Sequence, residues 1–276
     1  MTTAEHPEPE SLGESLEHAA FVPTPATPPV ARPERWWGRH LQEVRWQAEL
    51  MRLLVDPVFR GEGIPHGDGA PVIAVPGFLA GDSSLAVMRD WLRRIGYRPA
   101  PSRIHFNVDC SDRAANRLEQ EIEEANERTG RQVALIGHSR GGHFVKALAR
   151  RSPERISAAV SIGAGLDTPF DISFPTQAAV GAFRALYART SDRFVQNGCL
   201  TDTCRCRFTR DYAGEFPAEV PLTSIYSKGD GVVRWRACLV PYARNVEVTG
   251  SHVGLAFNRK VYRVLAETLA VQTRGR

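Results

Sequence analysis

Residues 133–149 read V-A-L-I-G-H-S-R-G-G-H-F-V-K-A-L-A, in which a glycine cluster around one serine separates two apolar stretches. The stretch before the cluster is typical of a buried strand, and the apolar residues after it recur at helical spacing. The cluster contains G-H-S-R-G, a G-x-S-x-G motif centred on Ser139. A strand before this motif and a helix after it predict a nucleophile elbow, a strained turn that raises the serine hydroxyl above the sheet.

A serine hydroxyl is a weak nucleophile unless a neighbouring base removes its proton. The partners of an elbow serine follow it along the chain in the order Asp or Glu, then His. Only His143 and His252 lie beyond Ser139. Because His143 falls one turn down the predicted helix, below the hydroxyl, His252 is the expected base. It lies in a predicted loop between the short strand 244–248 and a C-terminal helix.

Two aspartates could hold the imidazole of His252 in its working tautomer. Asp230 follows the predicted strand 223–226 and lies between two glycines, so it is the expected acid. Asp167, which follows the predicted strand 158–162, is the alternative. An aspartate beside glycine or proline is also a common turn former, so a purely structural role stays open for both.

The negative charge that develops on an attacked carbonyl needs hydrogen-bond donors that are already in place. The backbone N–H of Arg140, directly after the serine, is one expected donor to this oxyanion. The backbone N–H of Phe78, in the loop after an earlier strand, is the other. The Arg140 side chain could contact an acidic group of a substrate or pair with a neighbouring residue.

Strands and helices alternate along the middle of the chain. The apolar pattern predicts strands at 72–75, 103–108 and 133–136, and helices at 85–95 and 112–129. This β-α-β-α-β-α order predicts an α/β fold in which a mostly parallel central sheet carries helices on both faces.

The chain has 276 residues, enough for a sizeable core, and three regions are expected. Residues 1–31 hold five glutamates, several prolines and no lysine or arginine, which predicts a disordered tail. Residues 32–69 are expected to form an amphipathic helix at 34–55 followed by a linker, and residues 70–276 the α/β domain.

The helix at 34–55 is basic and carries tryptophan, so it could lie on a membrane surface, but packing on the α/β domain is favoured. Its expected inward face holds Trp37, Leu41, Val44, Ala48, Met51 and Val55. The net charge of the whole chain is +4, and residues 32–276 without the acidic tail carry +9. The arginines are scattered and no recognition motif accompanies them, so nucleic acid is not an expected partner.

No stretch is apolar over the roughly 18 residues that a membrane span needs. No secretory signal begins the sequence, so a cytoplasmic location is expected. The C-x4-C-x-C group of Cys199, Cys204 and Cys206 lacks the paired spacing of common zinc sites, so no metal is expected.

The P-G-F loop at 76–78, the motif at 137–142, Asp230 and His252, in this order, resemble the α/β-hydrolase superfamily. The G-H-S-x-G-G form is similar to that of its lipase and esterase branch. The chain differs from many relatives in having Pro-Gly where they have His-Gly in the oxyanion loop.

This resemblance covers about residues 70–270. It implies an eight-stranded, mostly parallel sheet and acyl-enzyme chemistry on an ester, thioester or amide. It also implies that an insertion at about 166–220 forms a lid that shapes the acyl pocket.

The sequence therefore predicts a serine hydrolase that cleaves a carboxylic ester through Ser139, His252 and Asp230. The expected substrate is a small-molecule acyl ester, and no cofactor is expected. A thioesterase, acyltransferase or peptidase that uses the same triad is the first alternative. A non-catalytic binding protein with this fold is the second, although a scaffold needs none of the three residues.

Overall fold

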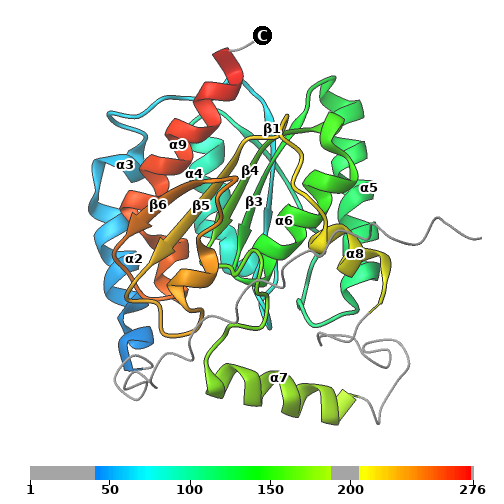
Figure 1. Ribbon diagram of the computed structural model, residues 1–276. Helices are drawn as coiled ribbons and strands as arrows, with labels where there is room; N and C mark the ends of the chain where they lie inside the picture. The colour runs from blue at the N-terminus through cyan, green and yellow to red at the C-terminus, as the bar shows by residue number, and fades with distance from the viewer. Residues whose placement is uncertain (1–40, 188–204, 275–276) are drawn as a thin grey trace, which may run out of the picture. The chain divides into compact units, whose positions relative to one another are not determined.

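The computed structural model describes residues 41–187 and 205–274 (Figure 1). Contacts divide the chain into two units, residues 1–34 and 35–276, and every described residue belongs to the second unit. Within the described residues, six parallel strands form one sheet in the order β2-β1-β3-β4-β5-β6. The strands are β1 (Pro71–Val75), β2 (Arg98–Ala100), β3 (Val133–His138), β4 (Ile156–Ile162), β5 (Leu222–Ser227) and β6 (Arg244–Val248).

Helices cover both faces of this sheet, as the alternating pattern predicts. One face packs against α5 (Ser111–Thr129), α6 (Arg140–Arg151) and α8 (Arg207–Ala213). The other packs against α2 (Trp46–Val55), α3 (Pro57–Arg60), α4 (Ala86–Arg94) and α9 (Arg259–Arg274). Figure 1 shows these layers on either side of the strands, with α7 (Phe174–Tyr187) beyond the end toward which the strands point. The 3₁₀ helices are η1 (Leu41–Arg45), η2 (Asp82–Leu85), η3 (Pro153–Arg155), η4 (Trp235–Cys238) and η5 (Val253–Phe257).

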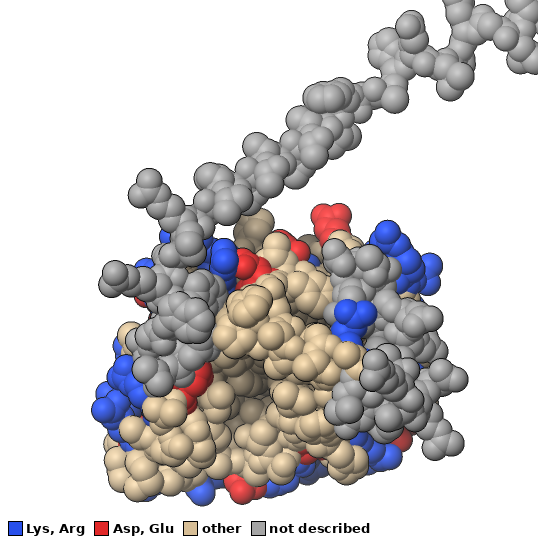
Figure 2. All heavy atoms as spheres, turned by 90° about the horizontal axis from the view of Figure 1, so that it is seen from below, with Lys and Arg blue, Asp and Glu red and all other residues tan. Residues whose placement is uncertain are grey.

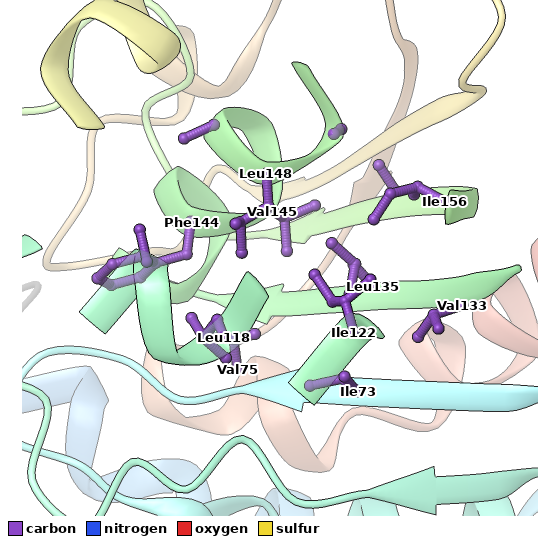
Figure 3. Packing of buried hydrophobic residues seen from close by; sticks show 14 of the residues in the cluster. Ile73, Val75, Leu118, Ile122, Val133, Leu135, Phe144, Val145, Leu148 and Ile156 are labelled. Atoms are coloured by element: carbon purple, nitrogen blue, oxygen red, sulfur yellow. The ribbon is translucent and has the colours of Figure 1, made fainter. Parts of the chain in front are cut away.

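Alternation of side chains along the strands divides the core between the two faces. In β1, Ile73 and Val75 pack with α5 and α6, whereas Val72 belongs to the cluster on the opposite face. Figure 3 shows Leu118 of α5 and Val145 of α6 among the buried side chains that lie against β1 and β3. An interior strand is covered on both faces, which is why β3 reads as a continuous apolar run.

The strand order creates a crevice at one point of the sheet. The chain leaves β1 to form β2 on one side and returns to form β3 on the other, so α4 and α6 cover opposite faces. Ligands of open parallel sheets bind at such a switch point, outside the carboxyl ends of the strands. The loop at 76–78 and Ser139 both follow directly from the two strands that meet there.

The second strand is not where the sequence pattern predicts it. It spans Arg98–Ala100 instead of 103–108. The predicted segment forms a loop that bonds to the loop after β1, with the Asn107 N–H donating to Ala80 O at 2.8 Å. The backbone of this segment is therefore satisfied by another loop and not by a sheet neighbour. Alternation of apolar side chains alone could not distinguish the two arrangements.

The described sheet has six strands where the resemblance implied eight. The segment before β1 is helical in the described residues and forms η1, α2 and α3. Asp56 caps α3 by accepting the Val58 N–H at 3.0 Å. Pro57 occupies the first helical position, where a missing N–H costs nothing. Residues 41–60 therefore add no strand to the sheet.

The described part of the predicted helix 34–55 packs with a different face from the predicted one, and Trp37 of the predicted face lies outside the described residues. Three residues of the predicted inward face are 68%, 61% and 70% exposed, namely Val44, Met51 and Val55. Leu53 is buried instead, and the Trp46 ring lies 5.8 Å from that of Phe257 in η5. The prediction was wrong because apolar residues occupy two adjacent faces of this helix, and spacing alone cannot choose between them. None of the described helices is both long and apolar enough to cross a membrane.

The turn between β3 and α6 has the strained geometry expected of an elbow. Ser139 has a φ of 53° and a ψ of −126°, which is rare for a residue with a side chain. A Cβ on Gly141 would lie 2.1 Å from Val75 O, and one on Gly137 would lie 2.3 Å from Gly141 C. Glycine is therefore required at both positions by the close approach of neighbouring backbones.

Gly141→Ala should destabilise the protein by about 1–3 kcal/mol, the usual cost of forcing extra atoms into a packed core. The reason is that the new methyl group meets a backbone carbonyl of β1. Gly181→Ala in α7 is the matched control, because nothing lies within 4 Å of the added Cβ and alanine is a better helix former. Urea unfolding measures both variants, and equal stability of the two would contradict the close-approach account.

Candidate active site

Ser139 lies at the carboxyl end of β3, between the loops that follow β1 and β4. Its N–H donates to Ile162 O of β4 at 2.8 Å. A Cβ on Gly77, in the loop after β1, would lie 3.0 Å from Ser139 Cβ, so that loop passes directly against the serine. The two neighbouring strand ends therefore enclose the serine at the switch point of the sheet.

The predicted acid and base are in direct contact. His252 Nδ1 lies 2.7 Å from Asp230 Oδ2. In the tautomer that donates from Nδ1, the outer ring nitrogen Nε2 is the basic atom. The other carboxylate oxygen accepts the N–H groups of Val232 and Val233, both at 2.8 Å. Asp230 and His252 are each 5% exposed, so the carboxylate and the ring are held in one orientation away from bulk water.

One neighbour of the serine in sequence contacts this pair. His138, the residue before Ser139, has its Nε2 2.9 Å from His252 O, and the two imidazole rings are 5.0 Å apart. Gly163, at the end of β4, leaves room for the pair, since a Cβ there would lie 3.3 Å from Asp230 Oδ2 and 3.4 Å from His252 Nδ1. In the part of the chain that the structure describes, no hydrogen bond joins the Ser139 hydroxyl to the His252 ring. Such contacts are often long before substrate binds.

The charges around His252 favour its protonated form. Burial lowers the pKa of His252, but the charge and hydrogen bond of Asp230, together with the charge of Glu43, raise it above its ordinary value. Burial and the neighbouring His252 lower the pKa of His138 to about 4. His138 is therefore uncharged at neutral pH and does not repel a proton on His252. A base whose pKa lies near the working pH can both accept and return a proton.

The alternative acid contacts other residues. Asp167 Oδ1 accepts hydrogen bonds from Lys146 Nζ at 2.8 Å and from the Tyr242 hydroxyl at 2.5 Å. Of the two aspartates considered from the sequence, Asp230 is the one that contacts His252.

The loop that carries Phe78 is held by a residue to which the sequence pattern did not point. Buried Asn107 donates from Nδ2 to Pro76 O at 2.7 Å and from its N–H to Ala80 O at 2.8 Å. It therefore bonds the loop on both sides of Phe78. The one available signal was an asparagine inside the predicted strand 103–108, because asparagine is disfavoured in strands.

The Arg140 side chain supports the same loop. Its guanidinium donates to Asn107 O and Asn107 Oδ1, both at 2.8 Å, and to Asp109 O and Ser111 Oγ, both at 2.9 Å. The Arg140 side chain thus bonds to neighbouring residues, which is one of the two alternatives considered from the sequence. The N–H groups of Phe78 and Arg140, the expected oxyanion donors, belong to two segments that Asn107 joins.

A cavity of about 660 Å³ opens beside Ser139. Much of its wall is apolar and includes Phe78, Phe170, Ile172, Val180, Phe208 and Phe216. Helices α7 and α8, both within the segment 166–220 that the resemblance assigns to a lid, supply part of this wall. Figure 2 views the molecule from this end and shows a hollow framed largely by uncharged residues. A cavity of this size and lining suits the apolar part of a small organic molecule.

His143 lines the same cavity, and its ring lies 5.3 Å from that of Tyr212. Burial, with the nearby charges of Arg140 and Lys146, lowers the pKa of His143 to about 3. It is therefore a neutral wall residue at physiological pH.

No three His, Cys, Asp or Glu side chains lie close enough together to hold a metal ion within 41–187 and 205–274. Cys199 and Cys204 of the C-x4-C-x-C group lie outside these ranges.

Asn107→Ala should lower kcat for the ester hydrolysis expected from the sequence by about 10²-fold, the usual cost of losing one oxyanion donor. Without the Asn107 side chain, Pro76 O and the Arg140 guanidinium lose a partner and the Phe78 loop is free to shift. Asn116→Ala is the matched control, because Asn116 accepts from Arg151 on an exposed surface. Steady-state kinetics of both variants test this, and an equal loss of kcat in the two would contradict the role of Asn107.

Comparison with known proteins agrees with this architecture. A family described as "alpha/beta hydrolase fold" matches residues 105–206. None of the curated proteins matches the chain. The mature form of the Bacillus licheniformis lipase BlEst2 is similar in structure, with a TM-score of 0.54 and 15% identity over 75% of this chain and 94% of that chain. The monoacylglycerol lipase of Paleococcus ferrophilus has a TM-score of 0.50 and 14% identity over 75% of this chain and 97% of that chain. The protein therefore has the α/β-hydrolase fold.

Proposed function

We propose that the protein is a serine hydrolase that cleaves carboxylic esters, with Ser139 as nucleophile, His252 as base and Asp230 as acid. The observation that carries this proposal is the 2.7 Å contact between His252 and Asp230 beside the strained Ser139. Backbone strain and buried ionisable groups both cost free energy. A binding or scaffold protein with this fold needs neither, so their combination supports catalysis.

In the acylation step, His252 Nε2 removes the Ser139 proton while the serine oxygen attacks the ester carbonyl. Asp230 holds the imidazole ring and stabilises the imidazolium that forms. The N–H groups of Phe78 and Arg140 stabilise the charge on the carbonyl oxygen. The imidazolium then gives its proton to the leaving alcohol, and the acyl group remains on Ser139.

In the deacylation step, water takes the place of the alcohol. His252 removes a proton from this water, and the resulting hydroxide attacks the acyl carbonyl. When the second tetrahedral intermediate collapses, the proton on His252 returns to Ser139 and the carboxylic acid is released.

The cavity supports an ester whose acyl or alkyl part is apolar. Its aromatic and aliphatic wall begins at Phe78, next to the expected oxyanion site, and extends to α7 and α8. The two similar structures above are those of a lipase and a monoacylglycerol lipase. An apolar group that enters this cavity would leave its ester carbonyl near Ser139.

The purified protein should hydrolyse p-nitrophenyl esters, and Ser139→Ala should lower kcat by at least about 10⁴-fold. Release of p-nitrophenol from the acetate, butyrate, octanoate and palmitate esters measures turnover and acyl preference. Ser152→Ala is the matched control, because Ser152 lies at the opposite end of α6 from Ser139. Its activity should equal that of the wild type.

Two outcomes would revise or contradict the proposal. Faster turnover of matching thioesters or anilides, or transfer of the acyl group to added alcohol in preference to water, would assign a different acyl chemistry. A protein that is folded by circular dichroism and turns over none of these substrates would contradict the proposed function.

A further inference from the structure

Glu43 in η1 is bonded to both loops that carry the proposed acid and base. Its Oε1 accepts the Gly231 N–H at 3.1 Å and the His252 N–H at 2.9 Å. Its Oε2 accepts the Val253 N–H at 3.0 Å. Gly231 directly follows Asp230, so one carboxylate near the start of the described chain bridges the acid loop and the base loop.

The two bridged loops lie beyond the ends of β5 and β6, where no strand pairing fixes their relative position. A shared acceptor holds the backbone beside Asp230 at a set distance from the backbone of His252. A carboxylate forms stronger hydrogen bonds with N–H groups than a neutral acceptor does. Glu49 in α2 adds two hydrogen bonds to the base loop, since it accepts the Ser251 N–H at 3.0 Å and the Ser251 hydroxyl at 2.8 Å.

Three ionisable groups surround His252 from different elements. Asp230 comes from the loop after β5, His138 from the end of β3, and Glu43 from η1. Against the lowering effect of burial, the two carboxylates raise the pKa of His252. His138 stays neutral, because its own pKa is lowered to about 4. An uncharged residue in place of Glu43 would therefore lower the pKa of His252.

We propose that Glu43 is a positioning residue of the active site, which holds the Asp230 and His252 loops together through its three backbone hydrogen bonds. The inference rests on the proposed function, since that function makes Asp230 and His252 the working pair. It makes the helical segment before β1 a part of the site, although none of the described residues 41–60 lines the cavity beside Ser139.

Glu43→Ala should lower kcat by about 10²-fold, as a misplacement on the order of 1 Å does, while KM changes far less. Glu43→Gln keeps an oxygen that can accept from Gly231 and His252, so it should retain more of the wild-type kcat. Both variants lose the negative charge. The acid limb of the wild-type kcat profile, set by a His252 pKa that lies above its ordinary value, should therefore move to lower pH in both.

Asp56→Asn is the matched control. Asp56 anchors the same N-terminal segment by accepting from Arg263 of α9 at 2.7 Å and by capping α3, but it contacts neither active-site loop. This variant should melt at a lower temperature and keep the wild-type kcat and pH profile. Equal shifts of the acid limb in Asp56→Asn and Glu43→Gln would overturn the proposal, because loosening of the segment would then suffice.

An NMR titration of the His252 imidazole gives a second readout that needs no substrate. Its pKa should fall in both Glu43 variants and stay at the wild-type value in Asp56→Asn. A His252 pKa and a kcat that are unchanged in folded Glu43→Ala would overturn the positioning role alone. A wild-type protein that turns over no ester would contradict the proposed function, and the titration would still test the Glu43 contact.

Discussion

The close passage of β1, β3 and α6 at Ser139 is the constraint on which the rest of the site depends. A side chain at Gly141 would overlap the carbonyl oxygen of Val75, so strand and helix meet only because backbone faces backbone there. That approach forces the chain to reverse at Ser139, in a conformation that costs on the order of 1–3 kcal/mol. Helices packed on both faces of the sheet hold this turn. The strand order places it at the switch point, where the connections that leave β1 and β3 lead to opposite sides of the sheet.

The remaining parts of the site come from loops that no sheet register positions, and polar side chains hold them. Arg140 and Asn107 bond the loop that carries Phe78. Asp230 orients His252, and Glu43 bonds the backbone beside both. Asn107 and Glu43 each meet backbone N–H or C=O groups that would be costly to leave unpaired. The serine is therefore fixed by close packing, whereas its partners are fixed by hydrogen bonds.

The difference between local packing at the serine and hydrogen bonds between distant loops explains which features the sequence could predict. The elbow carries a local pattern, a strand, glycines at set spacing and a helix, and the Asp230–His252 contact agrees with the order of the residues along the chain. The segment 103–108 alternates like a strand, but its backbone bonds to a loop that is distant in sequence. Helix α2 has apolar residues on two faces, and its tertiary contacts, among them those with η5 and α9, select the buried one. A single asparagine or glutamate has no periodicity, so the roles of Asn107 and Glu43 depend on tertiary contacts that no pattern encodes.

The most direct test of the central claim is peptide mapping by mass spectrometry after the folded protein reacts with a fluorophosphonate. Because an activated serine lies beside a neutral histidine, the folded protein should bind one equivalent of the fluorophosphonate at Ser139. The rate of this reaction should increase as the pH rises through the pKa of His252. The unfolded protein should not react at Ser139. Modification of Ser139 that is no faster than that of other serines, or none at all in the folded protein, would contradict the account.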